Sequence, residues 1–240
     1  MIHRFEILSS TNDEALDPRY VEGDVVWAEH QTAGRGQRGH TWIGGEGENL
    51  MFTMVFSPDF LPPVRQFFLS EAVALALVDA MRDYGIEARI KWTNDIYVGH
   101  RKLVGILIEH KLLKGKMARS IVGIGLNVNQ MEFDPSLPNP VSMAQAAGRE
   151  FNRREVLHSV AEHIMTRYDE LRAGNLEALR QEYCSLLYRL NEEHWYAWPD
   201  GERFRGTIRG VDMSGGLQVE HSDGHVASYM FKEIEFVLKN

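Results

Sequence analysis

A stretch near the middle of the chain, residues 121–129, alternates from Val122 onward between large apolar side chains and glycine or asparagine. Its apolar positions are Val122, Ile124, Leu126 and Val128, and the intervening positions are Gly123, Gly125, Asn127 and Asn129. A period of two is typical of a β-strand, whose successive side chains point to opposite faces. Glycine inside a strand weakens it and often marks the close approach of a ligand or another backbone. We therefore predict that the bare face is the floor of a cavity; the alternative is a glycine bulge facing solvent.

A glycine-rich segment, residues 34–47, lies between two apolar runs at 25–28 and 50–56 that we predict to be strands. Six glycines and two arginines, Arg35 and Arg38, fall within this segment. Successive backbone N–H groups in such a loop can form an anion-binding nest, and arginine adds forked donors suited to carboxylate and phosphate. The segment matches neither a Walker A loop nor a dinucleotide fingerprint. We predict a loop that closes over an anionic ligand; the alternative is a flexible hairpin with solvated arginines.

The near-continuous apolar run at 102–109 predicts a central, buried strand. A lysine, Lys102, stands at its first position. Such a lysine on its own is typically a strand-end side chain that extends its charge to solvent. Further cations at Lys91, Arg101 and the loop arginines favour a shared cationic site instead.

Helices are predicted from capping residues and apolar spacing in four later regions. Pro62 and Pro63 open a helix that ends near Gly85, as proline suits the first turn and glycine the position after the end. A short helix begins at Ser142, and longer covering helices follow Asn152 and Asn175. Near the N-terminus, Thr11 and Glu14 match a capping box; the alternative is a polar cluster, with Ser10 and Asn12, that faces a ligand.

The character of the chain changes at about residue 193. Short alternating runs follow, separated by turn sequences that contain Asp-Gly or Gly-Gly. This spacing indicates hairpins and a small all-β module. We predict a catalytic domain at 1–192 and a second domain at 193–240 whose thin core leans on the larger one.

Composition excludes several functional classes. The net charge of −8 argues against general binding to nucleic acid or anionic membranes, which usually requires a basic surface. The single cysteine, Cys184, permits neither an internal disulfide nor a thiolate metal cluster. The first residues contain no apolar signal core, and no apolar run is long enough to span a membrane. We therefore expect a cytoplasmic protein.

The cations and amides suggest one kind of chemistry if the predicted strand ends and the loop converge. Cations favour phosphates and carboxylates, whereas amides favour a polar uncharged group. Activation of a carboxylic acid by a nucleotide needs both, because clustered cations bring two mutually repelling anions together. The amides are Gln31, Asn94 and Asn127; the cations are Arg35, Arg38, Lys91 and Lys102; Asp95 is a candidate Mg²⁺ ligand on the phosphates. No nucleophilic triad or zinc spacing is evident.

Three motifs in order resemble the biotin–protein ligases over nearly the whole chain. The segment from Gly34 to Trp42, with Gly47, Asn49 and Leu50, resembles the biotin-loop signature of that family. The stretches 91–95 with 102–107, and 123–129, resemble its second and third signatures. The resemblance implies an α/β (α+β) fold with a mixed β-sheet flanked by helices, of the class II aminoacyl-tRNA synthetase and biotin ligase type. A small SH3-like β-barrel would follow it.

The resemblance also implies a two-step reaction with ATP, biotin and Mg²⁺. Biotin and ATP would give biotinyl-5′-AMP, from which a lysine of a biotin carboxyl carrier protein would take the biotinyl group. Lys102 and Arg35 would be catalytic. The implied biotin-binding residues are Ser10, Thr11, Asn12, Gln31, Arg35, Gly36, Gln37, Lys102 and Gly105. The implied ATP-binding residues are Arg35, Arg38, Trp42, Lys91, Asn94, Asp95 and Asn127, with Asp95 as the metal ligand.

Two positions depart from the pattern of the family. Thr93 stands where the family usually has proline, and we expect this difference to affect only the local backbone. Gln37 stands where the family usually has arginine, and the missing cation is expected to loosen retention of the negatively charged adenylate. Gln37→Arg is therefore expected to release biotinyl-5′-AMP more slowly than the unchanged protein, as measured by adenylate dissociation; equal rates would contradict the expectation.

Alternatives to this function come from two classes. A lipoate–protein ligase shares the fold and the adenylate chemistry, although the Gly-Arg-Gly loop and the 91–95 stretch favour biotin. A non-enzymatic carrier-binding protein would use the β-rich tail and leave Lys102 and the arginines without purpose. The catalytic pattern begins within the first dozen residues, so we expect no DNA-binding domain and no role on DNA. A free sheet edge would allow a homodimer.

Overall fold

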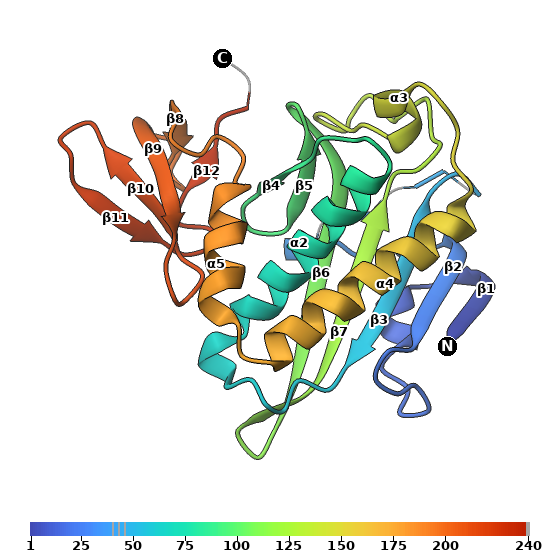
Figure 1. The fold of residues 1–240 in the computed structure, drawn as a ribbon. Helices are drawn as coiled ribbons and strands as arrows, with labels where there is room; N and C mark the ends of the chain where they lie inside the picture. Colours follow the sequence, from blue (N-terminus) through green and yellow to red (C-terminus); the bar gives the residue numbers. More distant parts are fainter. Residues whose placement is uncertain (40, 43, 46, 239–240) are drawn as a thin grey trace.

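A seven-stranded mixed β-sheet forms the centre of the computed structural model (Figure 1), which describes residues 1–39, 41–42, 44–45 and 47–238 except for the Arg38 side chain. The order of its strands is β1-β2-β3-β7-β6-β5-β4. Strand β1 pairs with β2 in parallel, and the other neighbours are antiparallel. The strands are β1 (Ile2–Leu8), β2 (Val25–Gln31), β3 (Leu50–Phe56), β4 (Arg89–Lys91), β5 (Asp95–Val98), β6 (Arg101–Leu113) and β7 (Lys116–Leu126).

The alternating stretch forms the C-terminal part of β7, at the middle of the sheet. Val122, Ile124 and Leu126 belong to the main hydrophobic core, and β7 pairs with β3 on one side and β6 on the other. The regular strand ends at Leu126 rather than continuing to residue 129, because the backbone of Asn127 and Val128 turns to pair with the segment at 141–144. The prediction of a strand with one core-facing side is confirmed.

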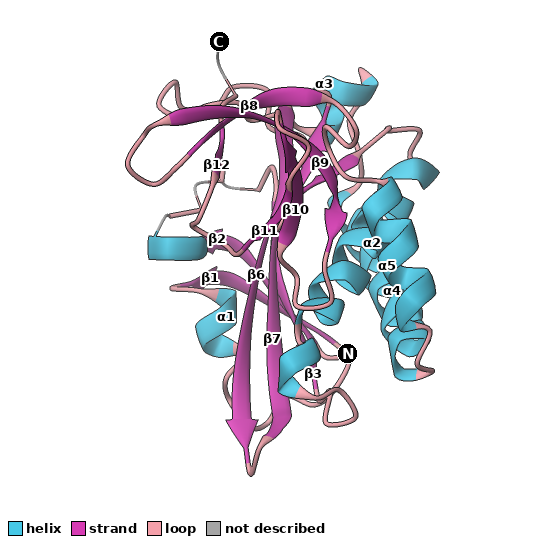
Figure 2. Ribbon diagram, turned by 90° about the vertical axis from the view of Figure 1, so that its left-hand side faces the viewer, coloured by secondary structure: helices cyan, strands magenta, loops and turns pink. Residues whose placement is uncertain are grey.

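Helices α2 (Phe67–Asp83), α4 (Arg153–Arg172) and α5 (Leu176–Ser185) cover one face of the sheet, whereas the short α1 (Thr11–Glu14) lies on the opposite face (Figures 1 and 2). A further helix is α3 (Met143–Ala147), and 3₁₀ turns lie at Gln37–Gly39 and Pro63–Arg65. The helix α2 buries most of its side chains between the sheet and helices α4 and α5. The open face opposite α2 is therefore the face on which a ligand site can form.

Capping outcomes differ from one helix to the next. Ser142 and Gln145 form the predicted reciprocal capping box, and the side chain of Asn152 accepts hydrogen bonds at the start of α4. Asn175 occupies the N-cap position of α5 without a side-chain cap. The predicted capping box at Thr11 is wrong: Ser10 is the N-cap residue, and the Thr11 hydroxyl bonds to a neighbouring strand instead.

The second sheet has five antiparallel strands in the order β11-β10-β9-β8-β12. It is joined to the larger unit by a continuous core, because Tyr196, Ile208 and Val219 belong to the same hydrophobic cluster as the helices. This agrees with the expectation that the small module leans on the large one, while the domain boundary at 192/193 stays a prediction. The strands are β8 (Glu193–Ala197), β9 (Arg203–Val211), β10 (Leu217–His221), β11 (Val226–Tyr229) and β12 (Glu235–Phe236).

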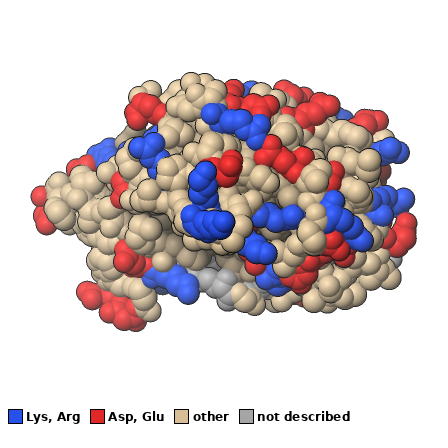
Figure 3. All heavy atoms as spheres, turned by 90° about the horizontal axis from the view of Figure 1, so that it is seen from below, with Lys and Arg blue, Asp and Glu red and all other residues tan. Residues whose placement is uncertain are grey.

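Charged side chains of both signs are interspersed on the face shown in Figure 3. None of the helices in the described part of the chain has the length and apolar character needed to cross a bilayer.

Candidate active site

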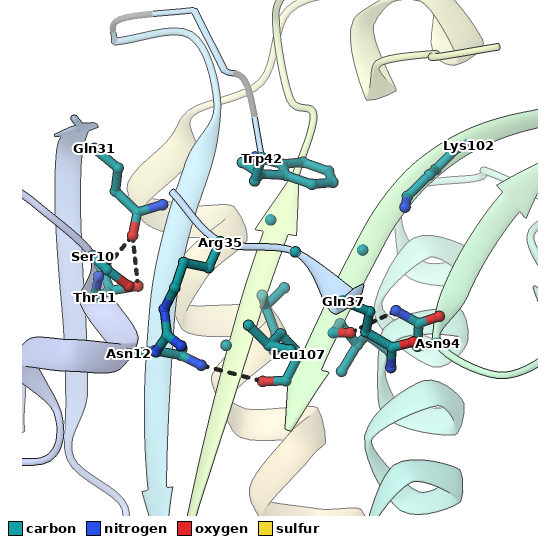
Figure 4. Close-up of a pocket in the computed structure, with 16 residues that line it drawn as sticks. Ser10, Thr11, Asn12, Gln31, Arg35, Gln37, Trp42, Asn94, Lys102 and Leu107 are labelled. Atoms are coloured by element: carbon teal, nitrogen blue, oxygen red, sulfur yellow. Dashed lines mark hydrogen bonds between the residues drawn. The ribbon is translucent and has the colours of Figure 1, made fainter. Parts of the chain in front are cut away.

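A cavity lies on the open face of the sheet and is lined by all three of the sequence stretches singled out above (Figure 4). Residues before and within α1 and at the end of β2 form one end, namely Ser10, Thr11, Asn12 and Gln31. The glycine-rich loop contributes Arg35, Gly36, Gln37 and Trp42. Strands β6 and β7 and the turn before β5 contribute Asn94, Lys102, Gly105, Ile106, Leu107, Gly123, Ile124 and Gly125. The central prediction, that these stretches surround one pocket, is confirmed.

The floor of the cavity depends on the glycines of the two central strands. A Cβ atom on Gly125 would lie 2.2 Å from the indole of Trp42, and one on Gly105 would lie 2.8 Å from the same ring. A Cβ atom on Gly123 would lie 2.2 Å from Oδ1 of Asn12. Side chains from other elements thus rest directly on the backbone of β6 and β7. The cavity-floor prediction holds, and the alternative of a bulge facing solvent is excluded.

One end of the cavity is a network of neutral polar groups. The backbone N–H of Thr11 donates to Gln31 Oε1 at 2.7 Å, and the Thr11 hydroxyl donates to the same oxygen at 3.1 Å. Behind them the Thr53 hydroxyl lies 2.8 Å from Thr11 Oγ1 and 2.7 Å from Asn12 Oδ1. Thr53 was not predicted as a site residue, although it is the one polar residue in the otherwise apolar strand β3. The network holds several donors and acceptors in fixed positions.

Arg35 enters the cavity from the loop and is held there by two carboxylates. Its guanidinium makes a forked pair with Glu109, at 3.0 and 2.9 Å, and donates to Asp13 Oδ1 at 2.7 Å. Glu109 also accepts a hydrogen bond of 2.7 Å from the Asn12 amide. The sequence analysis did not single out Asp13 or Glu109, which come from α1 and β6 and meet only in the fold. These two carboxylates offset most of the positive charge of Arg35 within the cavity.

Lys102 marks the other end of the cavity. Its Nζ lies 2.7 Å from Asp95 Oδ1, an ion pair that is close but not aligned as a hydrogen bond, and 5.7 Å from the centroid of the Trp42 ring. Lys91 Nζ lies 3.9 Å from the same carboxylate. Burial lowers the pKa of Lys91, and the Lys102 charge acts in the same direction against the attraction of Asp95. Two lysines thus share one carboxylate at this end.

The remaining predicted residues are placed differently. The Asn94 amide donates to the Ile106 carbonyl at 2.8 Å, and its side chain lines the cavity. Asn127 is buried and donates to the Val141 carbonyl at 3.0 Å, outside the cavity lining. Lys91 Nζ lies 4.7 Å from the centroid of the Phe236 ring in the β module. Lys91 and Asp95 are beside the cavity and do not line it. The Arg38 side chain lies outside the described atoms. Roles for these residues in ATP binding stay predictions.

Among the described residues, Gln37 Oε1 and Trp42 Nε1 are buried in the cavity wall and have no hydrogen-bond partner. Buried polar atoms are normally satisfied, so both atoms are available to bond a ligand. The cavity holds only about 50 Å³, well below the roughly 300–1,000 Å³ of ordinary ligand sites. A ligand therefore requires Trp42 or its loop to move outward.

The described residues contain no cluster of three or more His, Cys, Asp or Glu side chains that could hold a metal ion on their own. Asp95 is the acidic group nearest Lys102, and its carboxylate is already shared by two lysines. A hard cation here would need most of its oxygen ligands from a substrate.

Comparison with known proteins identifies the family of the chain. The family model described as the biotin/lipoate A/B protein ligase family matches residues 5–127, just over half of the chain. The chain belongs to this family. The matched segment of this ligase domain contains the glycine-rich loop, Lys102 and the bare face of β7, the parts that form the cavity.

Individual ligases of known sequence or structure agree with this assignment. The chain is 30% identical over 226 residues to the bifunctional ligase/repressor BirA of Bacillus subtilis, covering 91% of this chain and 69% of that protein. It is 31% identical over 217 residues to the biotin–[acetyl-CoA-carboxylase] ligase of Paracoccus denitrificans, covering 87% and 89%. A biotin protein ligase from Aquifex aeolicus, solved in complex with biotin and ATP, has the same fold, with a TM-score of 0.84 at 24% identity over 98% of this chain and 97% of that one.

Proposed function

We propose that the protein is an ATP-dependent ligase that converts biotin to biotinyl-5′-AMP and transfers the biotinyl group to a lysine of a biotin carboxyl carrier protein. The relatives named above support the reaction class. The main observation in support of the proposal is the order of the polar and cationic groups along one cavity. A neutral polar network lies at one end and an accessible lysine at the other (Figure 4), as a molecule with a polar uncharged head and a carboxylate tail requires.

The neutral end suits the ureido head of biotin. Ser10, Thr11, Asn12 and Gln31 supply both donors and acceptors, and bonds to Thr53 and Glu109 fix the orientation of Thr11 and Asn12. The glycines of β7, with Leu107 of β6, leave an apolar surface along which the fused rings and the aliphatic tail can lie. A charged head group would find no counter-charge among the four polar residues of this end.

The cationic end suits the reacting anions. Lys102 stands where the tail carboxylate and the α-phosphate of ATP would meet, and phosphate oxygens would compete with Asp95 for its ammonium group. Arg35, Gly36 and Gln37 would cover the tail and the adenylate, while Trp42 and Asn94 would contact the nucleotide. A fixed cation at developing negative charge stabilises the transition state more than the ground state. We assign Lys102 the main catalytic role and Arg35 the second.

The two steps balance without a covalent enzyme intermediate. A biotin carboxylate oxygen attacks the α-phosphorus, a P–O bond forms, and pyrophosphate leaves. The neutral amine of the carrier lysine then attacks the acyl carbon, a C–N bond forms, and AMP leaves with the electron pair of the broken C–O bond. Mg²⁺ would enter as MgATP and offset phosphate charge, with Asp95 as its one protein ligand and phosphate oxygens as the others.

The proposal has one direct test. The 240-residue chain is mixed with MgATP, a biotin carboxyl carrier domain and either biotin or lipoate, and the mass of the carrier is measured. We expect the mass of one biotinyl group to be added with biotin, and none without ATP. Addition of lipoyl alone would favour the lipoate ligase, and a carrier that binds but stays unmodified would favour a non-enzymatic role. A homodimer, the absence of a role on DNA and a cytoplasmic location stay predictions.

A further inference from the structure

A second cavity, of about 310 Å³, opens between the seven-stranded sheet and the β module. It adjoins the active-site cavity, because Gln37, Asn94 and Ile106 line both. The wall from the β module is fixed in place: Trp92 Nε1 donates to the Gly215 carbonyl at 2.9 Å, and a Cβ atom on Gly215 would lie 2.4 Å from Phe67. This second cavity, which we term the interdomain groove, therefore exists only because the β module packs against the catalytic unit.

The lining of the interdomain groove differs in charge from that of the active site. The active-site cavity contains Arg35 and Lys102, whereas no Lys, Arg, Asp or Glu is among the described residues that line the groove. His110, its one titratable lining group, makes a 2.8 Å hydrogen bond to Ser120, and burial lowers the pKa of its imidazole. A triphosphate would find no cation along this groove, so the groove is a poor path for ATP.

The groove has a mixed lining without fixed charge. Phe67, Trp92, Ile108, Met230 and Phe231 contribute apolar surface to its walls, and Gln66, Ser70, Thr93, His110 and Ser214 contribute polar groups. At the end shared with the active site lies the buried Oε1 atom of Gln37, which has no hydrogen-bond partner among the described residues. Apolar wall surface that leads to a neutral hydrogen-bond acceptor matches a lysine side chain, whose methylene stem packs on apolar surface while its nitrogen needs a polar partner.

We infer that the interdomain groove admits the acceptor lysine of the carrier protein, and that Gln37 Oε1 accepts a hydrogen bond from its nitrogen and aims it at the acyl carbon. The inference rests on the proposed function and deepens it. The lysine loses one proton to become a nucleophile before attack; its nitrogen gives up a second proton to solvent as the amide forms and AMP leaves. Gln37 is a positioning residue that takes neither proton.

The test places charge at the mouth of the groove and separates the two half-reactions. Met230 is 48% exposed, so its side chain tolerates substitution. Met230→Lys is expected to slow single-turnover transfer from preformed adenylate to the carrier about fivefold to tenfold, because a like charge opposes the incoming ammonium group. Met230→Glu is expected to transfer at least as fast as the unchanged protein. Gln66→Lys, on the opposite wall and also exposed, is expected to slow transfer in the same way.

Controls separate a local charge effect from damage to the fold. Val226→Lys adds the same charge at a position of similar exposure on β11 of the β module, outside the groove, and is expected to leave transfer unchanged. The defect of Met230→Lys should shrink at about 1 M salt, where the Debye length falls to about 3 Å. Biotin-dependent pyrophosphate release should be normal in all four variants.

The possible results are distinct. Slower transfer confined to the two lysine variants in the groove, with normal adenylate formation, supports the inference. Transfer rates equal to that of the unchanged protein overturn it. An equal loss in adenylate formation also overturns it, since the groove would then serve the nucleotide. If the unchanged protein itself makes no biotinyl-5′-AMP, the proposed function fails before the groove is tested.

Discussion

Replacing Lys102 with alanine is expected to lower the rate of biotinyl-5′-AMP formation about 100- to 1,000-fold, the usual cost of removing one preorganised charge-stabilising donor. The Lys102 side chain is the cation at the far end of the cavity from the polar network. Its Nζ pairs with Asp95 at 2.7 Å and the side chain stays one-third exposed, so little stability depends on it. The variant is therefore expected to lose catalytic activity and to keep its fold.

The measurement is biotin-dependent pyrophosphate release, together with a denaturant unfolding curve for the same preparation. Arg101→Ala is a matched control, because Arg101 is the preceding residue of β6, is exposed and does not line the cavity. It is expected to release pyrophosphate at the normal rate. A Lys102→Ala variant with near-normal release would show that Lys102 has another role and would remove the main catalytic assignment.

Replacing Arg180 with alanine is expected to destabilise the protein by about 3–5 kcal/mol, the usual cost of removing one partner of a buried ion pair. Arg180 Nε donates to Glu71 Oε1 at 2.5 Å, and Glu71 is fully buried in α2. Arg180 also donates to the backbone carbonyls of Val211 and Asp212, where β9 ends. Its loss would leave a carboxyl group and two carbonyls without their donor at the junction of α2, α5 and the β module.

The destabilisation should also depend on pH. Burial raises the pKa of Glu71 to about 7 even with Arg180 beside it, and loss of that cation would raise the pKa further. The folded state then retains a proton that the unfolded chain releases near pH 4.5, so the variant should lose stability as pH rises from about 5 to 8. The free energy of unfolding, from denaturant titrations at several pH values, measures both effects.

A surface pair provides the control for Arg180. Arg209 donates to Glu220 at 2.6 Å between β9 and β10, and both side chains are substantially exposed. Arg209→Ala is expected to cost no more than about 1 kcal/mol, as is usual for solvent-screened pairs. An Arg180→Ala variant that loses as little as this control would show that the buried pair does not hold the two units together.

Local patterns predicted much of the fold and of the candidate site. The alternation at Val122, Ile124 and Leu126 predicted a strand with one core-facing side, because side chains in a strand must alternate between faces. The same alternation placed Gly123 and Gly125 on the bare face, where Asn12 and Trp42 now rest. These predictions succeeded because each depends on residues within a few positions of one another.

Predictions that needed a distant partner were less successful. The capping role predicted for Thr11 from its neighbour Glu14 is wrong, because its hydroxyl bonds to Gln31, twenty residues away. The alternative, a polar cluster with Ser10 and Asn12, agrees with the lining of the cavity. The carboxylates that hold Arg35 come from α1 and β6, and no local spacing connects Asp13 with Glu109. Asn127 bonds through its amide to the backbone of the segment that follows β7, a contact that no local pattern indicated, and its predicted role in ATP binding stays a prediction.

The amino-acid sequence by itself determined which surfaces are bare, which strands are buried and which cations stand beside them, because side-chain periodicity and glycine content act over a few residues. Only the tertiary structure decided which of those groups face one another. The ion pair of Arg35 with Glu109, and the groove between Trp92 and the β module, depend on contacts between segments many residues apart. Chain packing, and not local preference, sets such distances.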